Sequence, residues 1–291
     1  MRLPASDTIV TYPGGDLTST GAVVALEPLA DGRTAVILDR TAFHPVDPVW
    51  PDQPADAGTL TVDGSERAIV DAVVGATDGA NLYIGDAPVR TGTEGWTFVV
   101  CHVVDDAAAL VLGAPVTVDV DPDARRALSA GHTACHLASL ALNDALAGLW
   151  TKEVARDGRG RPDFDRLAIT ESRILPYGSV DTYRAGKSLR KKGFAAADLA
   201  ERLTDVVQHA DRLLAEWLAT GAAVSIEREG ESLSERRFWT CALPEGVVRI
   251  PCGGTHLRSL GEVSEVRIEL ELEEAEGALQ LRMRTTAVPA Y

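Results

Sequence analysis

The stretch Val247-Val-Arg-Ile-Pro-Cys252-Gly-Gly-Thr-His256 places a cysteine and a histidine four residues apart, directly after an apolar run. The apolar run is typical of a β-strand. The two glycines between Cys252 and His256 favour a tight loop in which side chains approach a bound ion closely. Thiolate and imidazole are both ligands of zinc in proteins. The stretch therefore predicts a strand that leads into one half of a metal site.

A second pair of candidate ligands lies in His132-Thr-Ala-Cys-His136. Residues four apart lie on the same face of a helix, so both imidazoles can reach one ion. Either motif alone would more often be packing, a surface pair or an inert thiol. Two half-sites in one chain together offer three imidazoles and one thiolate, which is a four-ligand zinc set.

These two motifs, in this order, resemble the metal-binding motifs of the editing domain of alanyl-tRNA synthetase and of its free-standing relatives, the AlaX trans-editing proteins. The similarity extends to Leu38-Asp-Arg-Thr-Ala-Phe-His-Pro45, Gln53-Pro-Ala-Asp-Ala-Gly58, Asp163-Phe-Asp165 and Ser259-Leu-Gly-Glu-Val263. The resemblance implies that Zn²⁺ is held by His132, His136, Cys252 and His256. It also implies a site that hydrolyses the aminoacyl ester of Ser-tRNA(Ala) or Gly-tRNA(Ala).

One segment departs from that family. Its members usually carry a run of glycines before the glutamine, whereas this chain has Val46-Asp-Pro-Val-Trp-Pro-Asp52, which is longer and contains no glycine. Prolines and Trp50 cannot reproduce the close backbone approach of a glycine loop. We therefore expect a different wall on the aminoacyl side of the site.

Several polar residues flank the motifs. Gln53 and Thr255 are candidate catalytic residues, because both can hydrogen-bond the substrate. Asp163 and Asp165 can orient a metal-bound imidazole through its second nitrogen, although turn chemistry explains them equally well. Cys135 lines the pocket or, more commonly for a cysteine, packs in the core.

Composition sets outer bounds. The chain has 291 residues, 45% of them hydrophobic and 24% charged, which is ordinary for a soluble globular protein of one large or two smaller domains. It has no apolar stretch of the length that spans a bilayer, and its first residues lack the apolar core of a secretory signal. Of the four cysteines, Cys252 belongs to the metal motif and the other three sit singly in apolar contexts, which suits reduced thiols. We therefore expect a cytoplasmic protein without a membrane partner.

The net charge of -15 argues against a generally phosphate-binding surface, but basic residues cluster locally. We expect one cluster to contact the acceptor end of tRNA(Ala), with Tyr183 or Phe194 available to stack on a base. This cluster comprises Arg184, Lys187, Arg190, Lys191 and Lys192. The alternative is a solvated basic face that balances the acidic remainder.

The predicted fold class is α+β. Short apolar runs with Asp-Gly turns over residues 1–118 favour an N-terminal antiparallel β-barrel domain. Residues 119–291 predict an α+β editing-like domain with helices on an antiparallel sheet and an insertion at about 166–195. Asp121-Pro122 starts a helical region with two stretches, the second at about 132–149. A further helix is expected at about 196–219 and a hairpin at about 266–284.

The predicted function is zinc-dependent deacylation of mischarged tRNA(Ala) in trans. No aminoacylation domain or glycine-rich nucleotide loop is apparent, so we do not expect a synthetase. Two alternatives stay open: a zinc hydrolase of another small acyl or aminoacyl ester, and a non-catalytic module with structural zinc. The sequence does not identify the amino acid removed or the oligomeric state.

Overall fold

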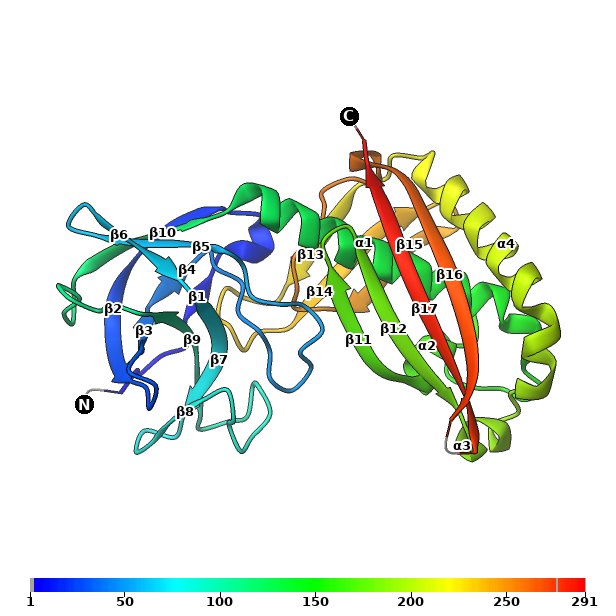
Figure 1. Ribbon diagram of the computed structural model, residues 1–291, viewed down its shortest axis with the longest axis horizontal. Helices are drawn as coiled ribbons and strands as arrows, with labels where there is room; N and C mark the ends of the chain where they lie inside the picture. Colours follow the sequence, from blue (N-terminus) through cyan, green and yellow to red (C-terminus); the bar gives the residue numbers. More distant parts are fainter. Residues whose placement is uncertain (1–2, 276, 291) are drawn as a thin grey trace. The chain divides into compact units, whose positions relative to one another are not determined.

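The computed structural model describes residues 3–275 and 277–290 and divides into two compact units (Figure 1). The first unit comprises residues 1–125, 226–238 and 252–255, and the second comprises residues 126–225, 239–251 and 256–291. The expected domain division at residue 118 stays a prediction. Among the described residues, no helix combines the length and the apolar character that a membrane crossing requires.

The first unit is built on an eight-stranded antiparallel sheet in the order β6-β5-β10-β2-β3-β9-β7-β8. Its strands are β2 (Thr18–Pro28), β3 (Thr34–Leu38), β5 (Gly58–Val62), β6 (Ser65–Ile69), β7 (Asp71–Thr77), β8 (Leu82–Ile84), β9 (Thr97–Val104) and β10 (Pro115–Val120). A short parallel pair joins β1 (Ile9–Val10) to β4 (Arg40–Thr41), and a 3-10 turn, η1, spans Tyr12–Gly14.

The antiparallel arrangement is confirmed, but the expected closed barrel is not found. Among the described residues, β6 and β8 are the two edges of the sheet. Turn signals specify local hairpins, whereas closure requires pairing of edge strands that are distant in sequence. The Asp63-Gly64 turn between β5 and β6 has φ values of 48° and 75°, and positive φ at both residues is typical of a hairpin turn.

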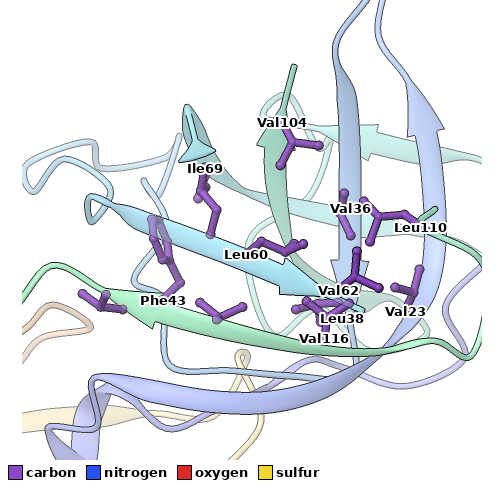
Figure 2. Close-up of a cluster of buried hydrophobic side chains, with 13 residues drawn as sticks. Val23, Val36, Leu38, Phe43, Leu60, Val62, Ile69, Val104, Leu110 and Val116 are labelled. Atoms are coloured by element: carbon purple, nitrogen blue, oxygen red, sulfur yellow. The ribbon is translucent and has the colours of Figure 1, made fainter. Parts of the chain in front are cut away.

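Alternating side chains from these strands form a buried apolar cluster (Figure 2). In β10, Val116, Val118 and Val120 are buried, while the residues between them face outward. Figure 2 shows Leu60, Val62 and Val116 pointing into this cluster from neighbouring strands. Burial of one face of strands such as β5 and β10 therefore contributes to the core of the first unit.

The helix that carries the histidine motif is α1 (Pro122–Ala145). The predicted start is confirmed, because the Asp121 carboxylate accepts hydrogen bonds from the amides of Asp123 and Ala124 at 2.9 and 3.0 Å. The expectation of two helical stretches is wrong, since α1 is continuous through Gly131. A Cβ on Gly131 would lie 2.2 Å from the carbonyl oxygen of Leu175. This glycine permits close packing and does not end a helix.

In the second unit, a four-stranded antiparallel sheet runs in the order β11-β12-β17-β16. These strands are β11 (Ile169–Leu175), β12 (Gly178–Ala185), β16 (Val263–Ala275) and β17 (Ala278–Pro289). The predicted C-terminal hairpin is confirmed, with Leu270 opposite Met283. β13 (Val224–Arg228), β14 (Arg237–Leu243) and β15 (Gly246–Pro251) form a further sheet in that order.

Short helices complete the second unit: α2 (Phe164–Ala168), α3 (Lys187–Lys191) and the 3-10 turns η2 (Ala147–Leu149), η3 (Ala196–Asp198) and η4 (Leu260–Glu262). The predicted long helix is α4 (Leu199–Leu218), which packs on β16 and buries Ala210, Leu214 and Trp217 (Figure 1). The segment expected as an insertion supplies β11, β12 and α3, and β12 pairs along β17. The α+β class is confirmed.

Candidate metal centre

Three imidazole rings converge in the second unit. His132 and His136 lie one turn apart on α1, with ring centroids 4.9 Å apart. The ring of His256 lies 4.3 Å from that of His132 and 5.1 Å from that of His136. The helical spacing predicted for the histidine motif is therefore realised, and the third ring comes from the loop after β15.

His136 has the properties of a metal ligand. Its Nε2 atom is buried and has no hydrogen-bond partner among the described residues. Burial lowers the pKa of His136 to about 4, so the ring is neutral and its nitrogen lone pair is available near neutral pH. A buried polar atom without a partner is costly, and a bound cation would satisfy it.

Neighbouring residues hold the rings of His256 and His136 in place. The Thr133 hydroxyl accepts a hydrogen bond from the Leu257 amide at 3.1 Å and lies 3.3 Å from Nδ1 of His256. Trp239, which is fully buried on β14, stacks at a tilt 5.1 Å from His136. Neither Thr133 nor Trp239 was singled out by the sequence. Thr133 lies inside the histidine motif, but nothing local marks Trp239.

Cys252 belongs to the loop that follows β15. Its amide donates to the Arg237 carbonyl at 3.0 Å, and the Gly254 amide points at its Sγ atom at 3.5 Å. Burial, with a smaller effect of the Asp52 carboxylate, raises the pKa of the Cys252 thiol to about 12. A nearby cation favours the thiolate, so the thiol becomes a strong ligand only together with an ion.

The structure groups the four predicted ligands. One potential ligand atom from each of His132, His136, Cys252 and His256 lies within 4.8 Å of the others. Cys252 and His256 are four residues apart in one loop, so the chain itself keeps this pair close. This group, the metal cluster, is able to bind a metal ion.

Gln53 and Thr255 are bonded to each other. The Gln53 side-chain amide donates to the Thr255 hydroxyl at 2.9 Å, and its oxygen accepts from the Thr255 amide at 3.0 Å. Both residues are almost fully buried. The pair fixes the glycine-containing loop to the segment at residue 53, and a catalytic role for either residue stays a prediction.

The segment before Gln53 exposes apolar side chains. Val49 and Trp50 are 61% and 41% exposed. The Asp52 amide donates to the Trp50 carbonyl at 2.9 Å, and the Asp52 carboxylate accepts from the Gln53 amide at 2.7 Å. The glycine-free segment is thus a tight turn with an exposed indole three residues before Gln53.

The acidic candidates have other partners. Asp163 accepts from the Arg166 amide as the N-cap of α2, and Asp165 accepts from the Tyr183 hydroxyl at 2.9 Å. The Cys135 thiol points at the Asp181 carboxylate at 3.5 Å. Among the described residues, the hydrogen bonds of Asp163 and Asp165 do not run to an imidazole of the metal cluster. Helix capping therefore accounts for the contact of Asp163, and packing against Tyr183 accounts for that of Asp165.

The basic cluster is on the surface, but its aromatic neighbours are not. All five basic side chains of the cluster, Arg184, Lys187, Arg190, Lys191 and Lys192, are exposed. Tyr183 and Phe194 are 0% and 3% exposed and pack against Phe164 with ring centroids 5.3 and 5.0 Å away. The expected stacking of either ring on a base is therefore wrong, because both rings are used in the core.

No protein-family model matches the chain, but individual proteins of similar sequence do. It is 26% identical over 254 residues to an alanine–tRNA ligase of Desulfosudis oleivorans, covering 87% of this chain and 24% of the ligase. It is 27% identical over 272 residues to the alanine–tRNA ligase of Frankia casuarinae, covering 90% of this chain and 26% of that ligase.

A third relative is of similar length. The chain is 26% identical over 249 residues to the alanyl-tRNA editing protein AlaX-M of Methanosarcina mazei, covering 84% of this chain and 83% of that protein. The chain thus spans about a quarter of the length of the ligases that it matches, and most of the editing protein.

Proposed function

Since this chain is a homologue of alanine–tRNA ligases and of the AlaX-M alanyl-tRNA editing protein, we propose that it is an AlaX-type editing protein. The reaction is hydrolysis of the aminoacyl ester of mischarged tRNA(Ala), with Ser-tRNA(Ala) or Gly-tRNA(Ala) as substrate, in trans. The observation that carries this proposal is the metal cluster of three imidazoles and one thiol. The cytoplasmic location stays a prediction.

The donor set fits Zn²⁺. Imidazole nitrogen and thiolate sulfur are its common protein ligands, and four of them suit its tetrahedral preference. The buried Nε2 atom of His136, which has no partner among the described residues, supports the same assignment. His132, His136, Cys252 and His256 would hold the ion. When bound, Zn²⁺ would polarise the ester carbonyl, lower the pKa of a water molecule, or hold the substrate's α-amino group.

The protein's own groups position this chemistry. With Nδ1–H of His256 donating to the Thr133 hydroxyl, Nε2 of that ring would carry the lone pair that holds the ion. The buried Trp239 indole beside His136 keeps water from that ring. Gln53 and Thr255 are the candidates for hydrogen bonds to the substrate, because Thr255 lies in the cysteine loop, Gln53 is bonded to it, and each carries both donor and acceptor atoms.

We further propose that the basic cluster contacts the acceptor end of tRNA(Ala). Its five side chains are exposed, and their charge contrasts with the net charge of -15 of the whole chain. Ammonium and guanidinium groups bind phosphate oxygens, so a local cluster allows an acidic protein to hold an RNA backbone. Tyr183 and Phe194 have no part in this proposal.

The decisive experiment measures deacylation of Ser-tRNA(Ala), Gly-tRNA(Ala) and correctly charged Ala-tRNA(Ala) by zinc-loaded wild type and Cys252→Ala. We expect cleavage of one or both mischarged species, slow or no cleavage of Ala-tRNA(Ala), and loss of cleavage in the variant. Absence of cleavage of all three by the zinc-loaded wild type would reject the proposed substrate.

A second candidate is hydrolysis of another small acyl or aminoacyl ester at the same centre. The exposed Trp50 in a glycine-free turn and the net charge of -15 favour it. Cleavage of small esters without tRNA binding would support this function. A purely structural zinc predicts instead that chelation unfolds the second unit and that esterase activity is absent.

A further inference from the structure

All four lysines of the chain lie in one part of the second unit. The sequence has 28 basic residues, Lys and Arg together, and its lysines are Lys152, Lys187, Lys191 and Lys192. Lys187 and Lys191 are the ends of α3, Lys192 follows it directly, and Lys152 comes from the loop after η2. All four side chains are exposed. A chain that otherwise uses arginine for positive charge thus gathers its lysines from two segments.

Hydrogen bonds and a contact between aromatic rings join these two segments. The Lys152 ammonium donates to the Lys191 carbonyl at 3.0 Å. Both the amide and the hydroxyl of Thr151 donate to the Gly193 carbonyl, at 2.9 and 3.0 Å. The rings of Trp150 and Phe194 pack with centroids 5.0 Å apart. Residues 150–152 are therefore attached to the C-terminal end of α3, and the two groups of lysines form one surface.

Gly193 makes this attachment sterically feasible. Its φ of 96° lies in the region that glycine adopts at no steric cost. A Cβ at this position would lie 2.9 Å from the amide nitrogen and from the Cβ of Lys152. A side chain at residue 193 would therefore displace Lys152 from α3. The position of Lys152 depends on a residue that carries no charge.

The neighbouring acid does not neutralise these lysines. Glu153, directly after Lys152, forms an ion pair with Arg156 at 3.2 Å. Arg184 and Arg190, both exposed, add to the positive charge around α3. We call this group of six side chains the lysine surface: Lys152, Arg184, Lys187, Arg190, Lys191 and Lys192.

We infer that the lysines of the lysine surface bind the sugar–phosphate backbone of an RNA without reading its sequence, and that Gly193 holds Lys152 in this surface. The inference rests on the proposed function for the identity of the RNA as a tRNA. Lysine carries a compact charge on a flexible stem and lacks the planar fork with which arginine reads guanine or grips one phosphate. Backbone contacts position an RNA but carry no sequence information directly.

The test is tRNA affinity as a function of salt concentration, with uncharged tRNA(Ala) and one unrelated tRNA. Log affinity falls linearly with log salt concentration. Replacing Lys152, Lys187, Lys191 and Lys192 together by Gln should reduce the magnitude of this slope by about three to four, equally for both tRNAs. Lys152→Gln alone should reduce the magnitude of the slope by about one. Arg90→Gln, an exposed cation of the first unit, is the matched control and should leave the slope unchanged.

Gly193→Ala tests the attachment without altering charge. It should reproduce most of the slope change of Lys152→Gln, with an unchanged circular dichroism spectrum. If this variant does not fold, Lys152→Gln decides the matter. An unchanged slope in both Lys152→Gln and the four-lysine variant would overturn the inference, and so would a loss of affinity for tRNA(Ala) only.

Failure of this inference differs from failure of the proposed function. If the four-lysine variant binds and deacylates Ser-tRNA(Ala) like wild type, the inference is wrong and the function stands. If wild type binds both tRNAs with the expected salt slope but cleaves no aminoacyl ester, the surface is supported and the proposed reaction is rejected.

Discussion

The hydroxyl of Thr133 lies 3.3 Å from Nδ1 of His256 and joins two segments that are 123 residues apart in the sequence. The same hydroxyl oxygen accepts the Leu257 amide and has a second lone pair, so it can also accept from Nδ1–H of His256 and leave Nε2 of that ring unprotonated for an ion. One threonine on the histidine helix thus orients a ring from the cysteine loop, and this relationship yields the first prediction.

Thr133→Val should lower zinc affinity about 10- to 100-fold, because the valine keeps the shape of threonine but cannot hydrogen-bond the His256 ring. The Leu257 amide would also lose its acceptor, which costs about 1–3 kcal/mol. Competition with a chromogenic chelator measures the affinity. Thr133→Ser, which retains the hydroxyl, should restore most of it, and equal affinities in all three proteins would contradict the prediction.

His132→Ala and Cys252→Ala should each abolish ester hydrolysis and reduce bound zinc, because each removes one of four ligands. Zinc content by atomic emission and deacylation of Ser-tRNA(Ala) are the measurements. Cys241→Ala is the matched control, because this buried thiol lies outside the metal cluster. Full activity in the absence of any metal would refute the assignment of the cluster as the reaction centre.

Gly131→Ala should destabilise the second unit, since the added Cβ would lie 2.2 Å from the Leu175 carbonyl oxygen and 2.5 Å from that of Gly178. Forcing a methyl group into close-packed backbone costs about 1–3 kcal/mol. Gly148→Ala provides the control, because no atom lies within 4 Å of a Cβ there. Urea denaturation of both variants gives the free energies of unfolding, and equal values would show that α1 can shift at no cost.

The contribution of Asp165 to stability should decrease as pH rises from about 4 to about 7. Burial is the largest effect on Asp165 and raises its pKa to about 7, although the Tyr183 hydroxyl opposes this shift. Between the unfolded and folded pKa values, the folded protein binds the proton that the unfolded chain has lost, so raising pH favours unfolding. Burial also raises the pKa of Asp181, which acts in the same direction.

Urea denaturation of wild type and Asp165→Asn across this pH range measures how the free energy of unfolding of each changes with pH. Asp165→Asn keeps an oxygen for the Tyr183 hydroxyl but cannot ionise, so its stability relative to wild type should increase between pH 4 and pH 8. Parallel pH dependences of the two proteins would rule out this behaviour of Asp165.

Features that depend on neighbouring residues could be predicted from the sequence. The four-residue spacing in the histidine motif places His132 and His136 on one helix face, and Asp121 caps that helix as expected. The alternation of apolar and polar residues predicts the hairpin in which Leu270 faces Met283. Helical and strand periodicity act over a few residues, so these patterns are visible without the fold.

The tertiary structure decided what depends on residues far apart in the sequence. The open edges of the first sheet, the continuity of α1 past Gly131 and the burial of Tyr183 and Phe194 are settled by packing against distant segments. The same holds for Thr133 beside His256 and for Lys152 against α3. By itself, the sequence determined which side chains are able to bind an ion and which local elements carry them. Only the folded chain determined their partners, because burial and steric exclusion act between segments that no local pattern relates.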